Sequence, residues 1–182
     1  MGDSKKLFLL DAFALIYRGY YAFIKNPRIN SKGTDTSAIL GFMNSLLEII
    51  RTQNPDYLAV AFDKGGSITR SEMFTEYKSN RDKTPEPILV AIPYIKDILT
   101  AMKIPILEKE GYEADDVIGT VAKDAENNNF KVFMVTPDKD FAQLVSDNVF
   151  LCKPARMGNS MEIWGVDEVK DRFEIENPEQ VI

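Results

Sequence analysis

Short apolar runs alternate along the chain with longer amphipathic stretches. The runs at 7–10, 57–62, 131–135 and 149–152 (LFLL, YLAVAF, KVFMV and VFLC) are typical of strands buried on both faces of a parallel sheet. A fifth short strand is predicted at 104–108, and a hairpin-like stretch follows the last run and reaches Trp164.

Helical spacing fills the segments between these runs. The clearest helix is predicted over 36–53, where apolar residues recur every three or four positions and Asn54-Pro55 ends the pattern. Further helices are predicted over 12–24, 88–102, 114–127 and, as a short one, 139–146. The alternation predicts an α/β fold of three layers, with a mainly parallel central sheet and helices on both faces.

The composition of the chain excludes several kinds of catalytic and metal-binding site. The 182 residues fit one domain and carry a formal net charge of -6. The sequence contains no histidine and only one cysteine, Cys152, which excludes His-dependent triads, imidazole zinc sites and internal disulfides. The four-residue apolar run near the N-terminus is too short for a signal peptide or a membrane span, so we expect a cytoplasmic protein with no membrane partner.

Acidic residues follow the predicted strands at the points where four of them end. The carboxyl ends of parallel strands meet at one edge of a sheet, where open α/β folds place their sites. Seven carboxylates from four segments are therefore expected to converge: Asp11, Asp63, Glu113, Asp115, Asp116, Asp138 and Asp140.

These seven acids require a counter-charge. Leaving them out changes the formal charge from -6 to +1, so the acidity of the chain is essentially that of the proposed site. With no histidine available, a pair of hard divalent cations, which prefer oxygen ligands, is the expected solution.

Most of these acids also have a local structural explanation. Asp115 and Asp116 could favour a helix dipole, Asp63 could belong to a turn, and Asp138 could cap the next helix. An acid that ends a buried strand, as Asp11 does, needs a partner. The repetition of an acid at four strand exits favours the metal site.

A basic segment lies between the second strand and the next helix. Arg70, Tyr77, Lys78 and Arg81 cluster within 69–83, directly after Asp63. Arginine suits bidentate phosphate contacts and tyrosine can stack on a base, although a solvated loop would have a similar composition. Acidic residues that can bind metal ions, next to basic residues that can bind phosphates, indicate a metal-dependent phosphodiesterase.

Three other residues have weaker signals. Arg18, on the first predicted helix, could also reach a phosphate. We expect Cys152 to be a core residue and Trp164 to be a packing residue or hairpin anchor.

Four motifs carry a family resemblance: LFLLDAFALIYRGYYAF, AVAFDKGGSITRSEMFTEYKSNR, GYEADDVIGTVAKDAE and VTPDKDFAQLV. In this order, and over nearly the whole chain, they resemble the N-terminal 5′-3′ exonuclease domain of bacterial DNA polymerase I. That domain is a member of the flap endonuclease family, which has a PIN-like fold. The resemblance implies that the seven acids bind metals and that Arg70, Tyr77, Lys78 and Arg81 form the substrate-contacting arch segment, about 64–87.

The resemblance also implies a mechanism and substrates. Two or more Mg²⁺ or Mn²⁺ ions would support hydrolysis near 5′ flaps, nicks and RNA-DNA primer junctions by a monomer. Asp11, Asp63, Glu113 and Asp115 are assigned chiefly to the first metal and Asp138 and Asp140 to the second, while Asp116 lies either between them or behind the residues that contact the metals. Lys78 and Arg81 would steady the scissile phosphate.

The chain departs from the family pattern at three places. Pro137 replaces a small residue and Ala12 a common glycine. The C-terminal ENPEQVI begins as a helix but offers only about one turn, so we expect residues 1–182 to be the PIN-like part of a longer protein. The family's GD-x-x-DN-x-PG segment, its helix-hairpin-helix element and the polymerase domain would follow, and without the last acids we expect weak or absent nuclease activity.

Two other functions stay open. A PIN-type ribonuclease would use a similar acidic edge without needing the basic segment, and a non-catalytic scaffold would bind metal and DNA without turnover. A Toprim-like site needs only a Glu and a DxD pair, fewer acids than the seven found here.

Overall fold

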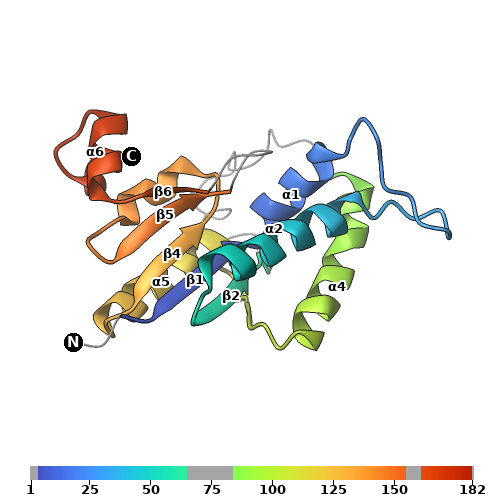
Figure 1. Ribbon diagram of the computed structural model, residues 1–182, viewed down its shortest axis with the longest axis horizontal. Helices are drawn as coiled ribbons and strands as arrows, with labels where there is room; N and C mark the ends of the chain where they lie inside the picture. The colour runs from blue at the N-terminus through green and yellow to red at the C-terminus, as the bar shows by residue number, and fades with distance from the viewer. Residues whose placement is uncertain (1–3, 65–83, 155–160, 182) are drawn as a thin grey trace.

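A six-stranded sheet forms the centre of the computed structural model, which describes residues 4–64, 84–154 and 161–181 (Figure 1). The strand order is β3-β2-β1-β4-β5-β6, and only β6 runs antiparallel to its neighbour. The strands are β1 Lys6–Asp11, β2 Tyr57–Ala61, β3 Ile106–Leu107, β4 Lys131–Val135, β5 Val149–Lys153 and β6 Glu162–Trp164. The predicted parallel sheet and the hairpin to Trp164 are confirmed, although β3 is shorter than the stretch 104–108.

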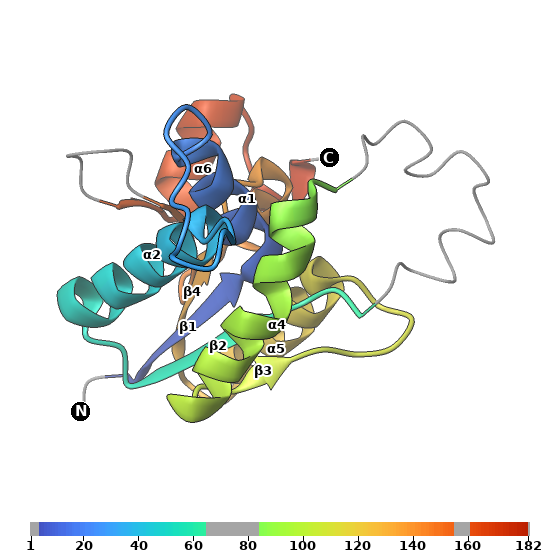
Figure 2. The same ribbon diagram turned by 90° about the vertical axis from the view of Figure 1, so that its right-hand side faces the viewer.

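Helices lie on both faces of this sheet (Figures 1 and 2). They are α1 Ala12–Ala22, α2 Ser37–Gln53, α4 Glu86–Ala101, α5 Ala114–Asn127 and α6 Val166–Phe173, with short 3₁₀ turns η1 Lys139–Leu144 and η2 Pro178–Gln180. The buried residues of α1, α2 and α4 form one core with one face of the sheet, and those of α5, η1 and α6 form a second core with the other. The predicted three-layer α/β architecture is confirmed.

Helix α6 was not predicted from the sequence. Its eight residues are mostly charged, and only Val169 among them is fully buried. A single apolar turn gives a weak periodic signal, so the helix depends on packing in the second core rather than on its own pattern. At the C-terminus the helix expected from ENPEQVI is the 3₁₀ turn η2.

Two residues of uncertain role belong to the packed interior. Cys152 is fully buried, and burial raises the pKa of its thiol to about 12, which confirms a core residue rather than a nucleophile. Trp164 is also buried, and the charged groups of Lys153 and Arg172 lie 3.9 and 4.3 Å from its ring centre. In the described part of the chain, no helix has the length and apolar character needed to span a membrane.

Two glycines allow α1 and α2 to approach each other closely. A Cβ atom on Gly41 would lie 2.2 Å from the Cα of Gly19, far inside van der Waals contact. This close contact places α1, and with it the segment that leaves β1, against the rest of the first core.

We therefore predict that Gly41→Ala destabilises the protein by about 1–3 kcal/mol, because the added methyl group cannot fit between the helices. Helix propensity alone would predict the opposite sign, a gain of about 1 kcal/mol. Urea unfolding measures the difference. The control is Leu40→Ala at an exposed position of the same helix, with an expected effect within about 0.5 kcal/mol; a Gly41→Ala protein as stable as the parent would contradict the prediction.

Candidate active site at the carboxyl edge of the sheet

Parallel register brings three strand exits together. β1 lies between β2 and β4, with Asp11 opposite Ala61 and Leu10 opposite Val135. The residues that follow these strands, Asp63 after β2 and Thr136 after β4, therefore start from the same edge as Asp11.

Asp11 is both the last residue of β1 and the N-cap of α1. Its carboxylate accepts the backbone N–H of Ala14 at 3.1 Å and the hydroxyl of Thr136 at 3.1 Å. Burial raises the pKa of Asp11 above its usual range, and the charges of Asp63 and Asp138 raise it further, while the two hydrogen bonds oppose the shift. The site thus concentrates negative charge around a partly desolvated carboxyl.

Asp63 connects the second strand to the start of α5. Its carboxylate accepts the backbone N–H of Ala114, the first residue of that helix, at 2.6 Å. The N-terminal N–H groups of a helix have no intrahelical partner, so a carboxylate there is favourable. This bond fixes α5 against the exit of β2.

The first turn of α5 holds three acids in a chain of local hydrogen bonds. Glu113 is the N-cap and is buried, with 6% of its surface exposed. Its backbone N–H donates to the Asp116 carboxylate at 3.1 Å, and the N–H of Asp116 donates to the Asp115 carboxylate at 2.7 Å. Asp116 therefore has a capping role at the start of α5, which the sequence analysis did not predict, and this role coexists with the place of these acids beside the depressions described below.

Thr136 joins the first and fourth strand exits. Its buried hydroxyl donates to Asp11 and accepts the backbone N–H of Asp138 at 3.2 Å. The Asp138 carboxylate in turn accepts the N–H of Asp140 at 3.0 Å and caps η1. The sequence offered no signal for Thr136 beyond its place after β4, because a threonine in a turn is common.

Two adjoining depressions contain all seven acids. The larger, of about 660 Å³, is lined by Asp11, Asp63, Glu113, Asp115 and Asp138, together with apolar residues such as Phe13 and Phe141. The other, of about 320 Å³, is lined by Asp115, Asp116, Asp138 and Asp140. Asp115 and Asp138 border both.

The donor set of these depressions suits a hard divalent cation. All of the acidic donors are carboxylate oxygens, and no histidine or thiolate competes with them in the sequence. Within the described ranges, no three such side chains are already arranged around one ion position. Mg²⁺ commonly uses only one or two carboxylates and retains water ligands, so this open arrangement fits it.

None of the predicted phosphate-binding residues is among the described residues that line the two depressions. Arg18 lines a separate small cavity beside α2, where its guanidinium donates to the Ser45 hydroxyl at 3.5 Å. The segment with Arg70, Tyr77, Lys78 and Arg81 lies outside the described residues. Sequence reasoning also missed Tyr17 and Thr84, which line the larger depression and are hydrogen-bonded to each other at 3.0 Å.

Comparison with known proteins decides the family. The family described as 5′-3′ exonuclease, N-terminal resolvase-like domain, matches residues 6–174. The chain belongs to this family of nucleases. The resemblance inferred from the four motifs is thereby confirmed.

Named relatives agree with this assignment. The 5′-3′ exonuclease of Aquifex aeolicus is 40% identical over 172 residues, which are 94% of this chain and 57% of that protein. DNA polymerase I of Bacillus subtilis is 37% identical over 183 residues, covering 100% of this chain and 20% of the polymerase. This member of the exonuclease family therefore spans a little over half of one relative and a fifth of the other.

A solved structure shows the same fold. The bacteriophage T5 flap endonuclease, crystallised as a pseudo-enzyme-product complex with DNA and metal ions, superposes with a TM-score of 0.72 at 20% identity. The match covers 97% of this chain and 64% of the T5 protein. At this identity the likeness establishes the architecture of the exonuclease family member and not its ligands.

The raised pKa of Asp11 predicts a cost to stability in the absence of cations. The folded state binds the proton more tightly than the unfolded state, so stability falls as the pH rises above the ordinary value of 3.8 and through the raised folded pKa. We expect Asp11→Asn to be more stable than the parent at pH 7 in EDTA, with a difference that shrinks as the pH is lowered. Urea unfolding at several pH values measures it, and a less stable variant at pH 7 would refute the electrostatic account.

The hydrogen bonds of Thr136 lead to a second prediction about stability, which can be tested separately. Thr136→Val removes the hydroxyl that joins Asp11 to Asp138, at an expected cost of about 1–3 kcal/mol because buried partners lose a hydrogen bond. Thr136→Ser retains the hydroxyl and should recover most of the loss. Urea unfolding of the two variants provides the comparison; a Thr136→Val protein as stable as the parent, or a larger loss in Thr136→Ser than in Thr136→Val, would show that the methyl group, and not the bond, matters.

Proposed function

We propose that this chain is the acidic, metal-binding part of a divalent-cation-dependent 5′-3′ exonuclease and 5′ flap endonuclease. The observation that carries the proposal is the convergence of five carboxylates, from four segments of the chain, on one depression at the carboxyl edge of the sheet. Membership of the exonuclease family supports it, as do the DNA and metal ions of the T5 complex. The same proposal assigns residues 1–182 to the PIN-like part of the exonuclease domain, with a basic arch at about 64–87.

In this proposal the acids have distinct roles. Asp11, Asp63, Glu113 and Asp115 hold a first cation, Asp138 and Asp140 a second, and Asp116 lies between the two positions. Bound Mg²⁺ or Mn²⁺ would supply an activated water and stabilise the leaving oxygen. The geometry that supports this division is that Asp115 and Asp138 border both depressions.

The basic residues and Tyr77 are proposed to position the nucleic-acid strand. Lys78 and Arg81 would neutralise the scissile phosphate, and Arg70 and Tyr77 would hold the 5′ strand by ionic and stacking contacts. Arg18 would contact a phosphate from the cavity beside α2, outside the acidic depressions. Asp11 and Asp63 are held by backbone and hydroxyl donors, so they would meet the substrate in a fixed geometry.

The biological setting is part of the same proposal. The substrates are DNA with a 5′ flap or nick and RNA-DNA primer junctions, in repair and primer removal by a cytoplasmic monomer. The bacterial DNA polymerase I relatives support this setting. Because the chain spans 57% of the Aquifex exonuclease, the residues present here are proposed to be insufficient for full activity.

Cleavage of a 5′-labelled flap duplex in Mn²⁺ tests the function. We compare the 182-residue chain with a version continued by the unmatched part of the Aquifex exonuclease, each with and without Asp115→Asn. We expect cutting by the extended protein, a fall of at least about 100-fold with Asp115→Asn, and little cutting by the short chain.

Asp97→Asn is the matched control, since this exposed acid of α4 lies outside both depressions and should leave the rate unchanged. Cutting that Asp115→Asn leaves intact would refute the acidic site. Cleavage of single-stranded RNA irrespective of a flap would indicate a PIN-type ribonuclease instead, and metal binding without any turnover would indicate a scaffold.

A further inference from the structure

A second group of charged residues lies beside the acidic depressions, at the exit of β5. The backbone N–H of Thr136, directly after β4, donates to the carbonyl of Cys152 in β5 at 3.1 Å. Lys153, the last residue of β5, therefore leaves the sheet next to the turn that carries Asp138. This position brings a cation to the same edge of the sheet as the seven acids.

Lys153 projects to the side of the sheet on which the smaller depression opens. It pairs with Glu162 across the β5–β6 hairpin. Two positions earlier in β5, Leu151 pairs with Trp164, and residues two apart on a strand share a face. Leu151 and Trp164 belong to the second core, together with residues of α5, η1 and α6. The smaller depression is lined mostly by residues of α5 and η1, so it opens on this same side.

Two cations share one indole ring in this group. The Lys153 ammonium lies 3.9 Å and the Arg172 guanidinium 4.3 Å from the ring centre of Trp164, and the aromatic face attracts both charges. Arg172 reaches the ring from α6, which lies next to β6 (Figure 1). It is also paired with Glu162 at 3.4 Å, and the indole N–H of Trp164 donates to the same carboxylate at 3.1 Å. The two cations are thus held in defined positions.

The cations of this group outnumber its anions. Glu162 is the register partner of Lys153 and the ion-pair partner of Arg172, so one carboxylate faces two cations. Burial lowers the pKa of Lys153, and the charge of Arg172 lowers it further. The charges of Glu162 and Asp138 oppose this shift, whereas Lys139, at the start of η1, adds to it. Like charges held around one ring favour the binding of an anion between them.

We propose that Lys153 and Arg172 form a binding site for a phosphodiester of the nucleic-acid strand that the acidic edge would cut. A backbone phosphate supplies the negative charge that the pair requires, and lysine and arginine are the side chains that neutralise phosphates in such complexes. The Arg172 side chain is 51% exposed, so a phosphate can reach it from solvent. The inference rests on the proposed function, because it takes the substrate to be a nucleic acid.

The position of this site predicts a path for the strand. The predicted basic arch follows Asp63 at the exit of β2, whereas Lys153 lies at the exit of β5. β1 and β4 lie between these two strands, so the two exits are about 14 Å apart across the acidic edge. Phosphate contacts fix the position of a bound strand without reading its sequence. A strand held at both places would therefore cross the acids that are proposed to bind the cations.

DNA binding without cleavage tests the site. The 182-residue chain is kept in EDTA, so that no divalent cation supports cutting, and the fluorescence anisotropy of a fluorescein-labelled 5′-flap duplex gives the Kd at several KCl concentrations. We expect Lys153→Gln and Arg172→Gln each to weaken binding about 3- to 10-fold and to lower the salt slope by about 1, because each removes one phosphate contact. Lys153→Arg retains the charge and should bind like the parent.

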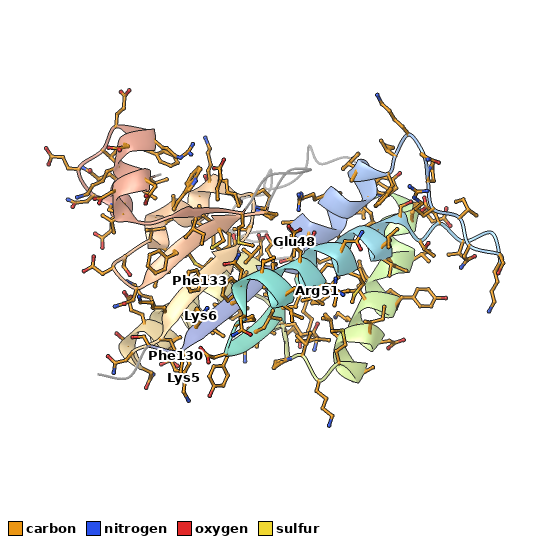
Figure 3. The ribbon with its side chains drawn as sticks, in the orientation of Figure 1. Lys5, Lys6, Glu48, Arg51, Phe130 and Phe133 are labelled. Atoms are coloured by element: carbon orange, nitrogen blue, oxygen red, sulfur yellow. The ribbon has the colours of Figure 1, made fainter. Side chains whose placement is uncertain are left out.

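Lys5→Gln is the matched control, with the same change in charge. Lys5 also lies over an aromatic ring, with its ammonium 5.4 Å from the ring centre of Tyr57 and bonded to the Tyr57 hydroxyl at 3.3 Å. It lies near Phe130, just before β1 and so at the opposite end of that strand from Asp11 (Figure 3). We expect Lys5→Gln to leave the Kd within about twofold of the parent, because salt screens a charge at that distance.

The single tryptophan of the sequence provides a second, local readout. Because Trp164 lies between the two cations, its fluorescence should change when the flap duplex binds, and this change should be smaller in Lys153→Gln. Inorganic phosphate, added at the same concentration of phosphate groups, should give a weaker response. Urea unfolding verifies that each variant is folded.

Several results would overturn the proposal. A Kd and a salt slope equal to those of the parent in both glutamine variants would show that the group is an ion network that only attaches α6 to β6. Equal loss of binding in Lys153→Arg would also assign a structural role. A Trp164 response to inorganic phosphate without binding of the duplex would assign the site to free phosphate. Since no cutting is measured, the result is independent of the cleavage test and would hold for a non-catalytic scaffold.

Discussion

The parallel pairing of β1 with β2 on one side and β4 on the other determines where the carboxylates lie. Because all three strands run in the same direction, their exits meet at one edge, and Asp11 lies between Asp63 and Thr136. The hydrogen bonds from Ala14 and Thr136 then fix the Asp11 carboxylate. The two helices that begin here, α1 and α5, both start at acids of the cluster.

In the absence of cations, this arrangement of carboxylates lowers the stability of the folded chain. Burial and the charges of Asp63 and Asp138 raise the pKa of Asp11, which means that its ionised form is disfavoured in the folded state. Helix N-termini compensate part of the repulsion, since Asp63 and Glu113 lie at the start of α5. Functional sites often retain such local conflicts, and bound cations would relieve this one.

Much of the fold and the candidate site could be predicted, and the misses have physical causes. The apolar runs located the strands, and the acids at their exits line the predicted edge. Thr136 was missed because its role depends on a contact with Asp11, which is 125 residues away in the sequence. Helix α6 was missed because only Val169 is fully buried, so tertiary packing stabilises it.

The most direct test of the acidic edge as a cation site is a Mn²⁺ titration of the ¹⁵N-labelled chain, followed by the broadening of amide signals in NMR spectra. The account predicts that broadening begins at the amides around Asp11, Asp63, Asp115 and Asp138, and that Asp115→Asn weakens it. Broadening that begins elsewhere, for example around the exposed Glu162 on β6, or that is unaffected by Asp115→Asn, would contradict the account.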